Sequence, residues 1–137
     1  MNIRTFLGID YGLKRVGVAV GNTLTGNAEP LSIIQRKDDE QVIKAIQQLI
    51  REWQISTLIV GVPRHPDGTA HEMTAQCLNF IAQLRAAFGI AVVEVDERYT
   101  SAVTTTKTTR KANGQVRSVA QDDQAAAIIL KQYLNDL

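Results

Sequence analysis

The sequence predicts an α/β fold in which a mixed β-sheet is covered by α-helices, and three observations predict it. Two glycine-containing apolar segments follow each other closely near the N-terminus, which is typical of a hairpin. A short, continuous apolar segment at Thr57–Val62 is typical of a strand buried on both faces of a parallel sheet, and Ala91–Asp96 is predicted to be another buried strand. Amphipathic segments with helical periodicity separate them. We therefore expect three antiparallel strands followed by parallel strand–helix–strand crossovers, in a single domain over residues 1–137.

The first half of the chain is predicted to contain three strands and one helix. Thr5–Asp10 and Arg15–Val20 form the hairpin, and Leu31–Gln35 follows a turn-rich stretch at 25–30 as the third strand. Asp39–Trp53 has the periodicity of an amphipathic helix. Its predicted core stripe consists of Val42, Ile46, Leu49 and Trp53, widened by Ile43 and Ile50.

In the second half, strands and helices alternate. Thr57–Val62 is a continuous apolar strand, and a helix at about Ala70–Phe88 follows it. Thr69 and Glu72 form a capping box for this helix, and Gly89 ends it. Its predicted core face consists of Met73, Cys77, Phe80, Leu84 and Phe88, so Cys77 is given a structural role.

The last two predicted elements are a buried strand and a helix. The strand is Ala91–Asp96, and the helix starts near Ser118, where Ser118 and Gln121 form a second candidate capping box. One stripe of this helix carries Ala126, Ile129 and Tyr133.

Composition excludes several classes of protein. Hydrophobic residues make up 45% and charged residues 21%, which indicates a globular rather than a disordered chain, and the net charge of +1 by itself predicts neither a nucleic-acid nor a membrane partner. No apolar run approaches the ~20 residues of a membrane span, and the N-terminus lacks the apolar region of a secretory signal. The single cysteine cannot form an internal disulfide, which fits a reducing compartment. We expect a cytoplasmic protein.

Asp10 is the most informative residue of the chain. It ends the first predicted strand, and a tight turn with Gly12 follows before the second strand begins. A carboxylate held at a strand end, beside a backbone with little side-chain bulk, suits a site that a metal-bound phosphate must approach. The ordinary alternative is an aspartate that caps a hairpin turn.

Two other places in the sequence put carboxylates where they can converge with Asp10. Asp96 and Glu97 end the last strand, and Asp122 and Asp123 open the last helix. Ligands gather at the carboxyl ends of parallel strands, and carboxylate oxygens are the ligands that hold Mg²⁺ or Mn²⁺. A site with two such metals suits phosphodiester hydrolysis. The alternatives are favourable electrostatics at a helix N-terminus and an ordinary surface strand end.

The sequence leaves open which member of each pair, Asp96 or Glu97 and Asp122 or Asp123, belongs to the site. Alternation along the strand puts Glu97 on the face of Val93 and Val95, and it puts Asp96 on the face of Val92. In the last helix, both Asp122 and Asp123 align with apolar residues.

Basic residues are concentrated between these carboxylates. Residues 98–121 contain no acidic residue, are rich in threonine, and have a composition that can contact a polyanion. Helix propensity is poor there, so we expect a frayed helix or a mobile loop that orders on substrate; the alternative is an ordinary solvated loop. The basic residues are Arg98, Lys107, Arg110, Lys111 and Arg117.

A proline-rich loop after the strand Thr57–Val62 carries Arg64 and His65. The N-terminus of the helix that follows can take a phosphate, and Arg64 lies beside it. His65 is a candidate general base or phosphate donor, although a single loop histidine is more often neither.

Taken together, these motifs resemble the YqgF/RuvX family, in the RuvC-like branch of the RNase H-like fold. The resemblance spans nearly the whole chain, in order and at suitable spacing. It rests on Gly8-Ile9-Asp10-Tyr11-Gly12, Lys14-Arg15-Val16-Gly17-Val18-Ala19, Ile59-Val60-Gly61-Val62-Pro63, Asp67-Gly68-Thr69, Asp96-Glu97-Arg98, and Asp122 leading into Ala125–Leu130.

The resemblance implies an RNase H-like mixed five-stranded sheet flanked by helices, and a divalent-metal nuclease activity. The family is described as a Holliday junction resolvase and as a nuclease that matures the 5′ end of the small-subunit ribosomal RNA precursor. Its acidic triad, which would hold Mg²⁺ or Mn²⁺, falls on Asp10, Glu97 and Asp122. The predicted nucleic-acid contacts are Lys14, Arg15, Arg64, Arg98, Lys107, Arg110, Lys111 and Arg117.

The sequence departs from the family's pattern at four places, which bear on substrate identity rather than on the fold. Leu13 stands where the family usually has a small residue such as Thr or Ser, and Arg64-His65-Pro66 replaces a commoner Leu-Asn-Met stretch. Tyr99 replaces Leu after the arginine, and Ala120 stands where a Lys is frequent.

These motifs suggest four candidate functions. We favour an endonuclease that acts on structured RNA, with ribosomal precursor particles as a partner and no membrane. A resolvase of branched DNA needs two sites in a symmetric dimer, whereas every apolar stripe here is assigned to the core, which favours a monomer. A non-catalytic RNA- or ribosome-associated protein would keep the fold without the chemistry. An ATPase lobe of the actin and sugar-kinase type is disfavoured, because that group builds its cleft from two such lobes.

Overall fold

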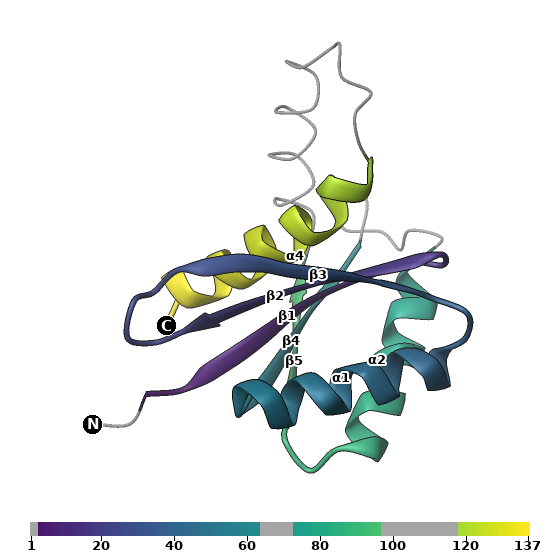
Figure 1. The fold of residues 1–137 in the computed structure, drawn as a ribbon, viewed down its shortest axis with the longest axis horizontal. Helices are drawn as coiled ribbons and strands as arrows, with labels where there is room; N and C mark the ends of the chain where they lie inside the picture. The colour runs from purple at the N-terminus through teal and green to yellow at the C-terminus, as the bar shows by residue number, and fades with distance from the viewer. Residues whose placement is uncertain (1–2, 64–72, 97–117) are drawn as a thin grey trace.

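The computed structural model describes residues 3–63, 73–96 and 118–137, with the backbone only for residues 118–123. Its elements are β1 (Thr5–Tyr11), β2 (Arg15–Asn22), β3 (Ala28–Gln35), α1 (Asp39–Trp53), β4 (Thr57–Val62), α2 (Thr74–Ala87), β5 (Ala91–Asp96) and α4 (Ser118–Asn135) (Figure 1). The strands form one sheet in the order β3-β2-β1-β4-β5. β1, β2 and β3 are antiparallel neighbours, whereas β4 is parallel to both β1 and β5. The predicted mixed five-stranded sheet is confirmed.

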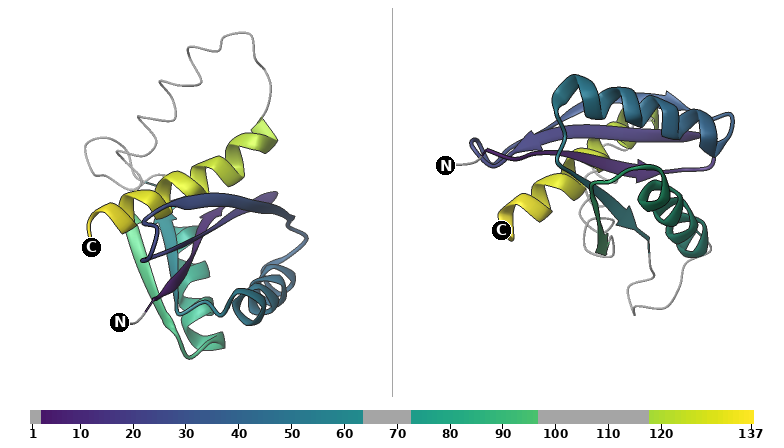
Figure 2. Two further views of the ribbon diagram at one scale, coloured as in Figure 1. Left: turned by 60° about the vertical axis from the view of Figure 1, so that its left-hand side comes forward. Right: turned by 90° about the horizontal axis from the view of Figure 1, so that it is seen from below.

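Helices cover both faces of the sheet, with α1 and α2 on one face and α4 on the other (Figure 2). Alternate strand residues pack in two separate cores, one on each face of the sheet. Leu7, Ile9 and Tyr11 of β1 pack in the core under α1 and α2. Phe6 belongs to the core under α4, where its ring meets that of Tyr133 edge to face, with centroids 5.6 Å apart. Strand alternation therefore decides which helix layer each residue faces.

Periodicity predicted several elements at their observed bounds. α1, β4 and β5 have the predicted limits, and α4 begins at Ser118 as expected. β4 is buried along its whole length, as a central strand between two helix layers should be. In α2, the predicted core residues Cys77, Phe80 and Leu84 are completely buried.

β1 ends at Tyr11 rather than Asp10 and β2 at Asn22 rather than Val20, and two further strand predictions need correction. β3 begins at Ala28 rather than Leu31, because pairing with β2 continues past a bulge, where Ala19 is opposite Pro30. A proline is tolerated there since β3 is an edge strand. β5 was predicted to be buried, but among its residues only Val92 is buried, because β5 forms the other edge of the sheet.

Two helix predictions also need correction. α2 begins at Thr74 with Met73 as its N-cap, not near Ala70, and the hydroxyl of Thr74 donates to the carbonyl of Pro63. The predicted capping residues of α2, Thr69 and Glu72, lie outside the described residues. Trp53 was assigned to the core stripe of α1 but is 41% exposed. It is the last residue of α1, and the chain leaves the helix axis at Gln54, whose φ is +54°.

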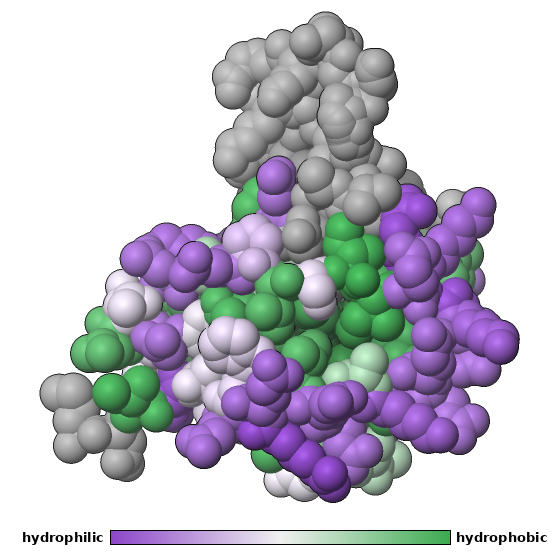
Figure 3. Space-filling view, viewed as in Figure 1, coloured by the Kyte–Doolittle hydropathy of each residue, from purple (hydrophilic) through white to green (hydrophobic). Residues whose placement is uncertain are grey.

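The face that carries β3 has an apolar centre surrounded by polar side chains (Figure 3). Three apolar residues of β3, Leu31, Ile33 and Ile34, are only half-buried. The bulge and Pro30 interrupt the edge of this strand, and such interruptions hinder pairing with another chain.

Candidate active site

Asp10 lies on the face of the sheet that α4 covers. It alternates with Phe6 and Gly8 along β1, and Phe6 belongs to the core under α4. On the β2 side it is paired with Gly17. On the β4 side the last pair is Ile9 with Val60, so Gly61 comes next beside Asp10. Both strands next to this carboxylate thus carry a glycine at its level, and Asp10 is half-buried.

Helix α4 approaches the sheet closely over β1 and β2. A Cβ placed on Gly8 would lie 2.8 Å from the Ala126 carbonyl oxygen and 2.8 Å from Leu130 Cβ. A Cβ on Gly21 would lie 3.0 Å from Leu134 Cδ1. The absence of side chains at Gly8 and Gly21 lets the helix backbone pack against the strands.

The contacts of α4 also set its direction over β1. Gly21 is opposite Phe6 at the start of β1 and faces Leu134, whereas Gly8, two residues farther along, faces Ala126. A step of two strand residues, about 6.6 Å, thus shifts the contact toward the N-terminus of α4, with Leu130 contacting both glycines. Continuing toward Asp10 therefore leads to the turn of α4 that precedes Ala126, which contains residues 122 and 123.

Asp96 lies on the opposite face from Asp10. It is paired with Val62 of β4, which packs in the core under α1 and α2. Val93 and Val95, in contrast, pack against the core under α4. The alternation predicted from the sequence is confirmed for these residues, and it separates Asp96 from the face of Asp10. Glu97 itself lies outside the described residues.

Of the predicted nucleic-acid contacts, some lie within the described residues and others lie outside them. Lys14 is exposed and Arg15 is half-buried, and both follow Asp10 closely in the β1–β2 hairpin. Within residues 3–63, 73–96 and 124–137, no three His, Cys, Asp or Glu side chains are grouped closely enough to hold a metal ion. Of the predicted triad, Asp10 is the residue whose side chain is described. Outside the described residues lie Arg64, His65, Arg98, Tyr99, Lys107, Arg110, Lys111 and Arg117.

Sequence patterns missed a polar network around Asp39, on the face of the sheet opposite Asp10. Asp39, the first residue of α1, accepts hydrogen bonds from the Tyr11 hydroxyl at 2.6 Å, from Arg36 Nε at 2.9 Å and from Gln83 Nε2 at 2.8 Å. The Tyr11 ring stacks on Phe80, with centroids 4.3 Å apart. An acidic residue in the first turn of a helix is ordinary, so the sequence offered no signal of these long-range partners.

The network shifts two pKa values. Burial is the largest cause and, together with the hydrogen bond to Asp39, raises the pKa of Tyr11 to about 12. For Asp39, burial alone would raise the pKa, but hydrogen bonds from Tyr11, Gln83 and Arg36 outweigh burial and lower the pKa below its usual value. The Asp39 side chain is 19% exposed, so solvent screens these contacts only partly.

The lowered pKa predicts how stability depends on pH. Because the folded pKa of Asp39 lies below its unfolded value of about 3.9, Asp39 stabilises the fold fully above that value, and this contribution is lost as pH falls through the folded pKa. The difference in unfolding free energy between wild type and Asp39→Asn should therefore shrink as pH is lowered below about 5. Urea unfolding at a series of pH values measures it. A difference that stays constant down to pH ~3 would contradict the assignment.

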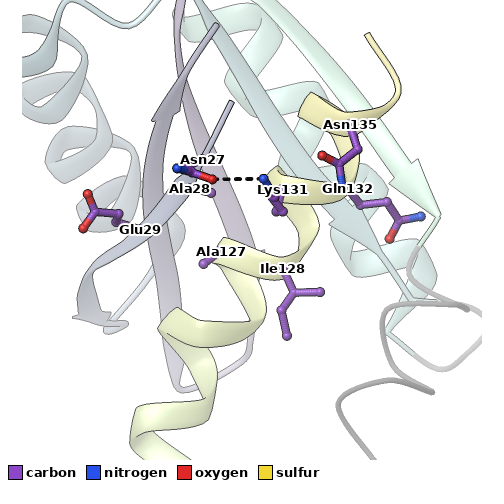
Figure 4. Close-up of a pocket in the computed structure, with 8 residues that line it drawn as sticks. All are labelled: Asn27, Ala28, Glu29, Ala127, Ile128, Lys131, Gln132 and Asn135. Carbon is purple, nitrogen blue, oxygen red and sulfur yellow. Dashed lines mark hydrogen bonds between the residues drawn. The ribbon is translucent and has the colours of Figure 1, made fainter. Parts of the chain in front are cut away.

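A hollow lies away from Asp10, between the start of β3 and the C-terminal half of α4 (Figure 4). Its volume is about 660 Å³. Lys131 Nζ lies at this hollow and donates to the Gly26 carbonyl at 2.7 Å and to Asn27 Oδ1 at 3.0 Å. These bonds hold α4 against the β2–β3 turn, so Lys131 has a structural role.

Comparison with solved structures establishes the type of fold. The structure of T. thermophilus RuvC in complex with a Holliday junction substrate matches with a TM-score of 0.62 at 12% identity, over 97% of this chain and 94% of that one. This likeness confirms the RNase H-like fold of the RuvC type. Together with the family match and the relatives of the chain, this fold defines a nuclease.

The chain belongs to the RuvX family, because the family model described as "RuvX: Holliday junction resolvase" matches residues 4–136. A protein of Burkholderia ambifaria named "Putative pre-16S rRNA nuclease" is 46% identical over 134 residues, which cover 97% of this chain and 90% of that protein. A protein of the same name from Paraburkholderia xenovorans is 48% identical over 133 residues, covering 97% and 89%. Among the described residues, no helix is long and apolar enough to cross a membrane.

Proposed function

We propose that this protein is a divalent-metal-dependent endonuclease that processes the 5′ end of the 16S ribosomal RNA precursor in the cytoplasm. The observation that carries the proposal is the placement of Asp10. Its carboxylate lies at the carboxyl end of a central strand, between Gly17 and Gly61, on the face that α4 covers. That position combines a rigid oxygen ligand with space for a phosphate group. Residues 1–137 act as one domain in this proposal.

We assign the metal ligands to Asp10, Glu97 and Asp122, with Mg²⁺ or Mn²⁺ as the ion. Support for Asp122 comes from the direction of α4, since the turn before Ala126 is the one that continues toward Asp10. Glu97 is preferred to Asp96 because Asp96 lies on the face of the sheet opposite Asp10. An all-carboxylate set fits these hard ions. When bound, the metal ions activate a water and stabilise the leaving oxygen of the cleaved phosphodiester.

Basic residues are proposed to hold the substrate backbone. Lys14 is exposed in the turn that follows Asp10, where its ammonium can reach a phosphate near the carboxylates. Arg15, Arg64, Arg98, Lys107, Arg110, Lys111 and Arg117 extend this contact in the proposal. Binding of a polyanion through such residues weakens steeply as salt concentration rises.

RNA is the favoured substrate, and branched DNA is the second candidate. The relatives at 46% and 48% identity carry a pre-16S rRNA nuclease name, whereas the family description names a Holliday junction resolvase. A resolvase cuts two strands and needs two sites in a symmetric assembly. The interrupted edge at Pro30 of β3 disfavours pairing of two sheets, which supports a monomer that makes a single cut.

A cleavage assay with two substrates tests the proposal. Purified protein with Mn²⁺ or Mg²⁺ is given a fragment of the ribosomal RNA precursor, free or within a precursor particle, and a four-way DNA junction. We expect cutting of the RNA that is lost on addition of EDTA. Preferential cutting of the junction would make the protein a resolvase. Salt-sensitive binding without cutting, unaffected by Mn²⁺, would instead indicate a non-catalytic RNA-associated protein.

A further inference from the structure

The polar network around Asp39 joins four parts of the chain on the face of the sheet that α1 and α2 cover, opposite the face of Asp10. Asp39 begins α1, and its carboxylate accepts hydrogen bonds from Tyr11 of β1, Arg36 of the β3–α1 loop and Gln83 of α2. Figure 1 shows the β1–β2 turn and the start of α1 at the same end of the sheet. With three donors at 2.6 to 2.9 Å, the carboxylate is held in one place.

Arg36 connects the Asp39 carboxylate to the turn 12–14, which follows Asp10. Its Nη1 donates to the Leu13 carbonyl at 2.9 Å, and its backbone N–H donates to the Lys14 carbonyl at 2.9 Å. Its guanidinium also lies over the Tyr11 ring, 5.6 Å from the centroid. One residue therefore binds two successive carbonyls of the turn, and Asp39 fixes the guanidinium of that residue through Nε and Nη2, both at 2.9 Å.

The side chains of the turn cannot fix its conformation by packing. Leu13 is 50% exposed and Lys14 is exposed. The turn is nevertheless tight, because a Cβ on Gly12 would lie 2.6 Å from the Arg15 carbonyl oxygen. Its geometry therefore depends on the bonds that its carbonyls receive, and these come from Arg36.

We infer that Asp39 is a positioning residue for the proposed nuclease site, acting through Arg36 and Tyr11 to hold the turn 12–14, and with it the direction of Asp10 and Lys14. The inference rests on the proposed function for its catalytic consequence. The order of the turn 12–14, in contrast, does not depend on the proposed function. The stack of Tyr11 on Phe80 and the core beneath it do not involve Asp39, so removing this carboxylate should loosen the turn more than the fold.

The test compares three variants with wild type. Asp39→Asn removes the charge that holds Arg36, and Tyr11→Phe removes one hydrogen bond without changing any charge. Glu40→Gln is the matched control, because Glu40 is the next residue of α1, its side chain is 81% exposed, and it pairs with Lys44 at 3.9 Å. The readouts are amide relaxation by NMR for residues 12–14, and kcat and KM for cleavage of the precursor RNA.

For Asp39→Asn we expect raised mobility of residues 12–14 and a fall in kcat of about 10- to 100-fold, the range for residues that orient a metal ligand. KM should rise by less than kcat falls, since Lys14 lies in the loosened turn but Arg15 lies in β2. Tyr11→Phe should change both readouts in the same direction by a smaller amount, and Glu40→Gln should match wild type. A role confined to stability would leave relaxation and kcat unchanged at temperatures where the variant is folded.

Two results would overturn the inference: wild-type relaxation in the turn of Asp39→Asn, or a kcat for this variant equal to that of Glu40→Gln. If Asp39→Asn does not fold, Tyr11→Phe decides the question by the same measurements. If the wild-type protein cuts neither substrate, the proposed function fails, and NMR relaxation of the turn still supports or overturns the positioning role.

Discussion

Replacing Asp10 with asparagine is expected to lower the rate of cleavage by more than about 100-fold. Residues that only orient a metal ligand contribute about 10- to 100-fold, so loss of a ligand oxygen should exceed that range. Asparagine keeps the size of the side chain but removes the negative charge that binds a hard cation. Single-turnover cleavage of the precursor RNA with Mn²⁺, at enzyme concentrations above the KM of wild type, measures the effect.

The fold of the Asp10→Asn variant should be retained. Asp10 is half-buried near the end of β1, and β1 is held by its ladders with β2 and β4 and by the burial of Phe6, Leu7 and Ile9. We therefore expect a urea unfolding midpoint close to that of wild type. A variant that unfolds at much lower urea would mean that lost activity reports lost structure.

Asp96→Asn is the matched control for Asp10→Asn. It makes the same chemical change at the carboxyl end of another parallel strand, but on the face of Val62, under α1 and α2. We expect Asp96→Asn to cleave like wild type, whereas Glu97→Gln should lose activity as Asp10→Asn does. The opposite pattern, with Asp96 essential and Glu97 dispensable, would refute the assignment of the two faces.

Replacing Gly8 with alanine is expected to destabilise the protein by about 1 to 3 kcal/mol, the usual cost of an added methyl group in a packed core. The new Cβ would lie 2.8 Å from both the Ala126 carbonyl oxygen and Leu130 Cβ. Neither atom is the end of a flexible side chain, so α4 has to move away from β1. Because α4 carries Asp122, cleavage should fall as well.

Urea unfolding measures this cost, and Gly89→Ala is its control. A Cβ on Gly89 would have no neighbour within 4 Å, so this variant should be neutral or slightly stabilised. With a slope of about 1–3 kcal/mol per molar urea, the midpoint of Gly8→Ala should drop by roughly 1 M relative to Gly89→Ala. Equal midpoints for the two variants would show that α4 is not packed as closely on β1 as its contacts indicate.

Short-range patterns predicted those features that depend on neighbours in sequence. Helical periodicity located α1 from Asp39 to Trp53, a continuous apolar run located β4, and β5 was also predicted at its observed bounds. Alternation in β5 separated Val92 from Val93 and Val95, and these residues do pack in different cores. Such patterns are readable because one element repeats its own geometry every 2 or 3.6 residues.

Features that depend on distant residues were misassigned or missed. The small residues around Asp10 were interpreted as space for a phosphate, which suits Gly17 and Gly61, but Gly8 instead makes room for α4. Trp53 fits the apolar stripe of α1 yet is 41% exposed, because nothing in the periodicity tells where the sheet beneath the helix ends.

By itself, the sequence determined the fold class, the order and type of the elements, and the membership of the RuvX family, because these depend on local periodicity and on motifs in a given order. Only the tertiary structure decided that Asp10 lies on the face of the sheet that α4 covers and that Asp96 lies on the opposite face. It also decided the hydrogen-bond partners of Asp39. Tyr11 and Gln83 lie 28 and 44 positions from Asp39 along the chain. Contacts across such separations depend on strand order and helix packing, which no local pattern encodes.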